Sequence, residues 1–164
     1  MNKTVNALVE QLQLLPHPEG GFYRETYRSS ISRVPHAEFS IAEKRNTSTA
    51  IYFLLTKGNF SAFHRIKQDE LWHHYLGDAV AIHTISPEGV YAKLLLGKDL
   101  NRNEFPQHIV KGGFWFASET IGEFALAGCT VAPGFDFADF DLPSRSKMLD
   151  LFPEHSEVIS RLTR

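Results

Sequence analysis

The chain has 164 residues, of which 43% are hydrophobic and 22% charged, the composition of one soluble globular domain. Its formal net charge of −2 argues against a protein that binds nucleic acid by neutralising the phosphates with Lys and Arg. We therefore expect no nucleic-acid partner. The single cysteine, Cys129, excludes an internal disulfide and a cysteine-rich zinc site. No apolar run approaches the ~20 residues of a membrane helix, and the chain starts without a secretion signal. We therefore expect a cytoplasmic protein with no membrane partner.

The first predicted element is an amphipathic helix over about residues 4–15. Its apolar residues recur every three or four positions, which places them on one helix face: Val5, Leu8, Val9, Leu12 and Leu15. Pro16 and Pro18 end the pattern. A turn-rich stretch over 17–21 and a short strand over 22–27 follow, and the polar segment 29–48 is expected to form a long loop.

From position 49 onward, short segments of β-branched, aromatic and aliphatic residues alternate with turn signals such as Gly77-Asp78. Strands that recur every ~8–12 residues predict an antiparallel sandwich or barrel, because the connections leave no room for crossover helices. Short C-terminal helices are expected over about 144–163, where Met148 and Phe152 form an apolar stripe. The sequence thus predicts one all-β domain over 1–164, with its strand core over about 22–142.

The stretch 58–77 carries the strongest chemical signal, because a histidine and a glutamate lie on successive predicted strands. A hairpin would bring His64 and Glu70 within side-chain reach on one face of a sheet. A histidine beside a carboxylate is typical of a general base or of a metal-ligand pair, and it also occurs as a structural hydrogen bond. We therefore take His64 and Glu70 as the candidate catalytic residues.

The same stretch resembles the first motif of the cupin superfamily. Four residues stand at the spacing of that motif: Gly58, His64, Glu70 and Gly77. Its second histidine is replaced by Ile66, and Phe116 stands where the histidine of the second motif is expected. Cupins hold a metal with three histidines and a glutamate, so the resemblance implies only two of four ligands. A tightly bound metal is therefore disfavoured, and we expect no cofactor.

Longer segments resemble one branch of the superfamily, the cupin 5 group, a domain of unknown function. They span residues 17–29, 48–55, 63–78, 107–118 and 123–142. The resemblance implies a double-stranded β-helix, the cupin jelly roll, usually dimeric and with a pocket in its mouth. The group is similar in fold to the deoxysugar 3,5-epimerases, which are metal-free cupins that pair a histidine base with an acid. It implies no established reaction.

Seven further side chains are candidates for binding a ligand: Arg24, Glu25, Trp72, His73, His74, Tyr75 and Trp115. Arg24 suits a carboxylate or a phosphate, although an ion pair with Glu25 is an equally simple interpretation. The two tryptophans suit a sugar or base ring, although strand aromatics are more often core. Strict alternation from Glu70 puts His74 on its face and His73 on the opposite one, and a bulge would reverse this.

These features predict a cupin that binds a small sugar-nucleotide-like or anionic molecule; if it is an enzyme, we expect a metal-free isomerase or epimerase. His64 would be the base and Glu70 its orienting or acidic partner. Two alternatives stay open. One is a non-enzymatic metabolite-binding protein with the same pocket, and the other is a metal-dependent oxygenase or hydrolase that adds His73 or His74 to the ligands.

A small-molecule ligand and a second copy of the chain are the partners that we expect. The ligand follows from the predicted pocket. The homodimer follows from an apolar strip beyond the last predicted strand, which suits a lid or an interface. The strip consists of Phe135, Phe137 and Phe140.

Overall fold

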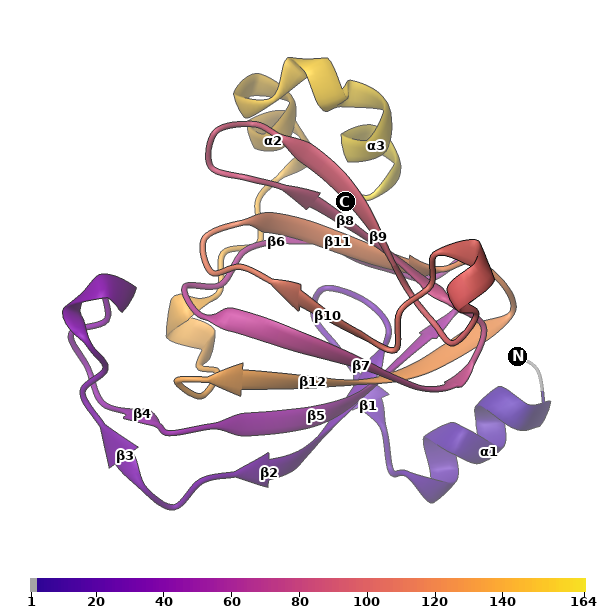
Figure 1. The fold of residues 1–164 in the computed structure, drawn as a ribbon, viewed down its shortest axis with the longest axis horizontal. Helices are drawn as coiled ribbons and strands as arrows, with labels where there is room; N and C mark the ends of the chain where they lie inside the picture. Colours follow the sequence, from indigo (N-terminus) through magenta and orange to yellow (C-terminus); the bar gives the residue numbers. More distant parts are fainter. Residues whose placement is uncertain (1–2) are drawn as a thin grey trace.

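The computed structural model describes residues 3–164, which form a jelly roll of two antiparallel sheets (Figure 1). The larger sheet contains, in spatial order, β1 (Leu15–Pro16), β2 (Phe22–Arg28), β5 (Thr49–Thr56), β12 (Phe124–Ala132), β7 (Asp69–Gly77) and β10 (Gln107–Val110). The smaller contains β6 (Phe60–His64), β11 (Trp115–Thr120), β8 (Val80–Ile85) and β9 (Tyr91–Leu96). A short 3-10 helix, η2 (Leu100–Arg102), precedes β10. The predicted all-β jelly roll is confirmed.

The main hydrophobic core lies between the two sheets. Phe53 and Trp72 of the larger sheet cluster with Ile82 and Phe116 of the smaller one, and each is at most 1% exposed. Phe53 and Trp72 meet edge to face, with ring centroids 5.7 Å apart. Because successive strand residues point to opposite faces, the alternating pattern of the sequence places these side chains in one layer.

The N-terminal helix α1 (Lys3–Gln11) packs on the outer face of the larger sheet. There, Val5 of the helix and Leu54 of the sheet belong to one apolar cluster. It ends earlier than the predicted helix over 4–15. Gln13 adopts a left-handed conformation with a φ of 53°, which turns the chain so that Leu14 is buried. None of the helices over residues 3–164 has the length and apolar character needed to span a bilayer.

The C-terminal helices cover the outer face of the smaller sheet, as Figure 1 shows, close to the predicted range of 144–163. They are α2 (Arg145–Leu151), the 3-10 helix η4 (Pro153–His155) and α3 (Ser156–Arg161). The Ser144 hydroxyl accepts a hydrogen bond from the Lys147 amide at 3.3 Å and so caps α2. Met148 and Ile159 are fully buried in a second core with Trp115 of β11.

Two local predictions are corrected by the tertiary structure. β6 and β7 follow each other in the chain but belong to different sheets, so they do not form the expected hairpin. His64 and Glu70 therefore reach the interior from different sheets and not from one sheet face. The segment 29–48 is also more ordered than a loop, because it contains β3 (Ser32–Arg33), the 3-10 helix η1 (Ala37–Phe39) and β4 (Arg45–Asn46), with β3 paired to β4.

A buried ion pair ties this segment to the chain beyond β12. Arg45 of β4 donates to both carboxylate oxygens of Asp139, at 2.8 and 3.0 Å, and the Gln68 amide donates to Asp139 at 2.8 Å. Asp139 belongs to the 3-10 helix η3 (Phe137–Asp139), which lies at one end of the barrel. The side chains of Arg45 and Asp139 are only 6% and 1% exposed. Their contact therefore fixes η3 against the barrel.

The first prediction concerns this ion pair. Asp139→Asn should lower the free energy of unfolding by about 3 kcal/mol, because it removes the buried carboxylate that pairs with the Arg45 guanidinium. Urea denaturation followed by circular dichroism measures the loss.

The matched control is Glu43→Gln, which removes the other carboxylate beside Arg45. Glu43 lies 3.5 Å from the guanidinium and its side chain is 80% exposed. Its substitution should cost less than about 1 kcal/mol, because water screens an exposed pair. Equal losses in the two variants would contradict the importance of burial.

Candidate active site

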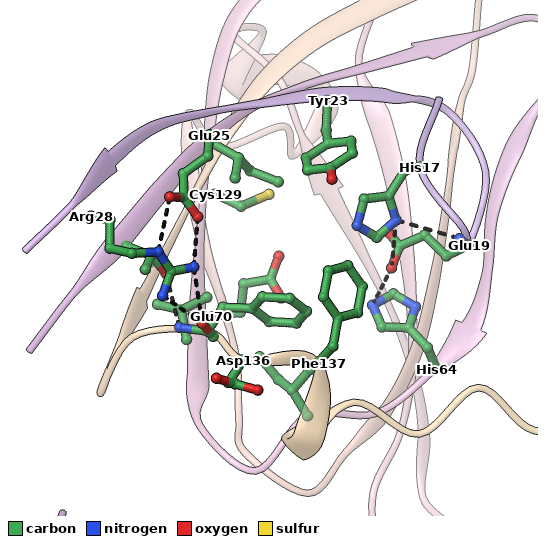
Figure 2. A pocket seen from close by; sticks show the side chains of 15 residues that line it. His17, Glu19, Tyr23, Glu25, Arg28, His64, Glu70, Cys129, Asp136 and Phe137 are labelled. Carbon is green, nitrogen blue, oxygen red and sulfur yellow. Dashed lines mark hydrogen bonds and ion pairs between the residues drawn. The ribbon is translucent and has the colours of Figure 1, made fainter. Parts of the chain in front are cut away.

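A cavity of about 470 Å³ opens at one end of the barrel. Figure 2 shows Glu25 and Arg28 on one side of it and His17, Glu19 and His64 on the other. The turn 17–21, strands of both sheets and the segment 133–137 contribute its walls. The lining residues are His17, Glu19, Tyr23, Glu25, Arg28, Thr49, Ile51, His64, Ile66, Glu70, Cys129, Val131, Phe135, Asp136 and Phe137.

The turn at 17–21 carries a glutamate into the barrel. The Ala62 amide of β6 donates to the Glu19 carbonyl at 2.8 Å, which holds the turn against that strand. Gly20 has a φ of +114°, and a Cβ there would lie 2.1 Å from the Phe60 carbonyl oxygen. Only glycine allows this close approach. The approach places the Glu19 side chain beside His64.

Glu19 and His64 form a buried pair in which both histidine nitrogens are engaged. The His64 Nδ1 atom lies 2.7 Å from the Ala62 carbonyl oxygen, so Nδ1 carries the proton and donates it. The other nitrogen, Nε2, lies 3.1 Å from the Glu19 carboxyl group. The Ser61 hydroxyl donates to the second oxygen of Glu19 at 2.8 Å. His64 thus takes Glu19, and not Glu70, as its acidic partner.

Burial favours the neutral form of both members of this pair. Burial lowers the pKa of His64 to about 3, although the hydrogen bond to Ala62 opposes this change. Burial raises the pKa of Glu19 well above its usual value, and the nearby charge of Glu70 raises it further. A protonated Glu19 can donate to the free lone pair of His64 Nε2, which matches the tautomer imposed by Ala62.

A second imidazole lies next to this pair. The Glu19 amide donates to His17 Nδ1 at 3.4 Å, and burial lowers the pKa of His17 to about 4. The His17 ring meets Tyr23 edge to face, with centroids 4.5 Å apart. The Tyr23 hydroxyl points into the cavity (Figure 2), and within residues 3–164 it has no hydrogen-bond partner. It is therefore available to a ligand.

Glu70 of β7 is a further buried acid of the cavity, next to Cys129 of β12. The Cys129 thiol and the Glu70 carboxyl group line the same cavity. Burial raises the pKa of Glu70 to about 7, while the neighbouring Cys129 thiol lowers it. Burial and the charge of Glu70 together raise the pKa of the Cys129 thiol. Glu70 can therefore both accept and donate a proton near neutral pH.

The seven residues predicted to bind a ligand lie in different places. Glu25 lines the cavity together with the predicted catalytic residues His64 and Glu70. Arg24 points elsewhere and donates to the Leu12 carbonyl at 3.1 Å.

The two tryptophans are part of the hydrophobic cores. Trp72 is 1% exposed within the main core, and Trp115 lies in the second core outside the barrel. The Arg65 guanidinium covers the Trp115 ring at 4.3 Å from its centroid. Neither indole lines the cavity.

The remaining three candidates follow one another on β7 and also lie outside the cavity lining. His73 contacts Gln107 and Thr130, while His74 Nε2 lies 3.0 Å from the Asp78 carbonyl oxygen. The ring of Tyr75 meets the ring of Tyr52, with centroids 6.1 Å apart. A register shift between β7 and β12 leaves Tyr75 as the extra, unpaired residue, because His74 pairs with Ala127 and Leu76 with Leu126. The bulge lies beyond His74 and brings neither histidine into the cavity.

The cupin metal site has lost its donors in this chain. Phe116 pairs directly with His64 across β11 and β6, and the two ring centroids are 4.0 Å apart. Ile66 and Phe116 both belong to the main apolar core. Within residues 3–164, no group of three or more His, Cys, Asp or Glu side chains is arranged to hold a metal ion. The residues present therefore do not fit the metal that the fold implies.

These features define a cupin whose mouth holds buried acids in place of a metal-ligand set. A family model described as "Cupin superfamily (DUF985)" matches residues 6–143, and the chain belongs to this family, as its sequence resemblance to the cupin 5 group predicted. An uncharacterized protein of Saccharomyces cerevisiae is 30% identical over 148 residues, which cover 83% of this chain and 73% of that protein.

Solved structures agree with this assignment. A hypothetical protein from Leishmania major has a TM-score of 0.89 and 32% identity, and covers 96% of this chain and 97% of its own. A protein from Shewanella oneidensis has a TM-score of 0.89 and 39% identity over 100% of this chain and 99% of its own. Oxalate decarboxylase from Bacillus subtilis has a TM-score of 0.55 and 16% identity over 90% of this chain and 36% of its own, which shows a shared fold only.

Several cavity residues were not selected from the sequence, above all His17, Glu19, Tyr23 and Arg28. No spacing rule links the turn 17–21 to a strand that begins at Phe60. The available signal was the resemblance itself, because the family segments 17–29 and 123–142 contribute much of the lining.

The second prediction uses the buried state of Glu70. The pKa of Glu70 in the folded protein, about 7, lies above the usual value of 4.5. The contribution of protonated Glu70 to the free energy of unfolding is therefore complete below pH 4.5 and is lost as the pH rises through 7. Relative to wild type, Glu70→Gln should therefore gain up to about 3 kcal/mol of unfolding free energy between pH 5 and pH 8. Urea titrations at several pH values measure it.

Glu123→Gln is the control, since Glu123 carries a carboxylate that is 61% exposed. Its stability relative to wild type should stay within about 0.5 kcal/mol over the same pH range. If the stability difference between Glu70→Gln and wild type does not change with pH, the raised pKa of Glu70 in the folded protein is refuted.

Proposed function

We propose that this protein is a metal-independent isomerase or epimerase, which moves a proton at a carbon atom next to a carbonyl group of a small molecule. The observation that carries this proposal is the placement of two buried carboxylic groups, Glu19 and Glu70, on different walls of one cavity. An epimerase needs a base on one face of the reacting carbon and an acid on the other. The chemistry requires no Lewis acid, which agrees with the apolar residues at the metal positions.

Glu70 is the base in this proposal. Its pKa of about 7 leaves a useful fraction ionised at neutral pH, and it takes the proton from the carbon atom. His64 was the base expected from the sequence, but its lowered pKa and its two engaged nitrogens make it a weak proton acceptor. His64 instead positions the acid group of Glu19.

Glu19 is the acid that returns a proton to the other face, a step in which this proton leaves the hydrogen bond to His64 Nε2. Burial favours its protonated form, and the Ser61 hydroxyl donates to it and stabilises the carboxylate that remains after transfer. The Tyr23 hydroxyl supplies a hydrogen bond to the carbonyl oxygen, where negative charge develops. The apolar side chains of Ile51, Ile66 and Val131 exclude water from the same space.

The third prediction is that the protein exchanges substrate hydrogen with solvent. In D₂O, a panel of keto compounds that includes 4-keto sugars and amino ketones should contain at least one that gains deuterium beside its carbonyl group. Glu70→Gln should slow that exchange about 100-fold or more, because it removes the base. Proton NMR of the compounds follows the exchange, and addition of EDTA should leave the rate unchanged.

Glu123→Gln again serves as the control and should exchange at the wild-type rate. An unchanged rate in Glu70→Gln would exclude Glu70 as the base. Compounds that bind without any exchange would favour the alternative of a non-enzymatic metabolite-binding protein.

A further inference from the structure

Acidic residues outnumber basic residues around the cavity. Four carboxylic residues line it, against one residue with a permanent positive charge among the described lining residues. The acidic residues are Glu19, Glu25, Glu70 and Asp136, and the basic residue is Arg28. The two lining histidines add no positive charge at pH 7, because burial keeps both neutral. The cavity therefore offers little to an anionic ligand.

Arg28 is already engaged by protein atoms. It donates to both carboxylate oxygens of Glu25 at 2.9 and 2.7 Å. It also donates to the Asn46 side chain at 2.8 Å and to the Phe135 carbonyl oxygen at 3.2 and 3.3 Å. Such a bidentate pair uses the N–H groups of the guanidinium that would otherwise bind a carboxylate or a phosphate.

Two carboxylates keep free acceptor capacity. Asp136 accepts one hydrogen bond, at 2.9 Å from the Ala138 amide to its Oδ1 atom, and its other oxygen has no hydrogen-bond partner within residues 3–164. Glu70 is 8% exposed, and the Cys129 thiol is its neighbour in the cavity lining. A carboxylate can accept about four hydrogen bonds, so both residues can bind a donor from a ligand.

Aromatic rings line the space beside these carboxylates. Phe135 and Phe137 meet edge to face, with centroids 5.0 Å apart, and Tyr23 lies across the cavity in Figure 2. Phe137 is 52% exposed at the opening. The face of an aromatic ring is electron-rich and attracts cations, most strongly where water is excluded.

We infer that the cavity selects a small cation of the amine or ammonium class, held between Asp136, Glu70 and the rings of Phe135, Phe137 and Tyr23. Within the proposed function, on which the reaction part of this inference rests, the substrate is therefore an amine-bearing carbonyl compound. This differs from the anionic or sugar-nucleotide-like substrate expected from the sequence, for which Arg28 would have to be free.

Three isosteric probes test the charge preference directly: choline, 3,3-dimethylbutan-1-ol and 3,3-dimethylbutanoate. They share a branched head and differ in charge, being a cation, a neutral alcohol and an anion. Chemical-shift titration of the full-length protein at pH 7.5 should give an affinity for choline about tenfold higher than for the alcohol, with the carboxylate weakest. Shifts should concentrate on residues that line the cavity.

Two variants separate the effect of the Asp136 charge from that of the Glu25–Arg28 ion pair. Asp136→Asn keeps the hydrogen bond to the Ala138 amide but removes the charge, so it should weaken choline about three- to tenfold and leave the alcohol unchanged. Glu25→Gln releases the Arg28 guanidinium, and it should strengthen binding of the carboxylate probe several-fold. The alcohol reports on the shape of the cavity in both variants.

Equal affinities for the three probes, tighter binding of the carboxylate to wild type, or no binding of choline at the highest concentration tested would each overturn the inference. The failure of the proposed function is distinguishable. A clear preference for choline without hydrogen exchange in any amino ketone would refute the reaction alone, whereas exchange confined to anionic keto compounds would support the reaction and refute the charge preference.

Discussion

Burial of acidic and imidazole side chains inside an apolar barrel is the constraint on which the candidate site depends. Glu19, His64 and Glu70 are 5%, 3% and 8% exposed, so an unpaired charge on any of them would lose most of its hydration. The site meets this constraint through shifted pKa values: burial raises the pKa of Glu19 well above its usual value and that of Glu70 to about 7, and lowers the pKa of His64 to about 3. The low polarity that makes these groups neutral also strengthens each hydrogen bond that they offer to a ligand.

The jelly roll supplies this environment because it folds distant segments onto one opening. The turn 17–21, β7 and the segment after β12 are far apart in sequence, yet each contributes to the same cavity. The Arg45–Asp139 ion pair holds the last of these in place, together with the aromatic residues that it carries. Where other cupins position metal ligands, Ile66 and Phe116 provide hydrocarbon, and the Phe116 ring packs on His64. Two positions of the cupin metal motifs are thus apolar in this chain.

The charge balance of the opening changes the chemistry expected from the sequence. From the sequence, Arg24 was the candidate for binding a carboxylate or a phosphate. In the fold, Arg24 donates to the Leu12 carbonyl just beyond the end of α1, while Arg28 reaches the cavity already paired with Glu25. Asp136 and Glu70 then leave the opening with excess negative charge. The position of one strand residue relative to the barrel mouth therefore underlies our proposal of a cationic ligand in place of an anionic one.

Sequence periodicity and turn spacing were sufficient to predict the antiparallel barrel, the N-terminal helix and the C-terminal helices, because each depends on contacts between neighbouring residues or on a repeated burial pattern. The cupin spacing also indicated His64 and Glu70, and both line the cavity. The pairing of His64 with Glu19, the separation of β6 and β7 into different sheets, and the exclusion of Trp72 and Trp115 from the site were decided by tertiary structure alone. These features depend on how two sheets close around a common interior, and local sequence patterns do not encode which residues meet across it.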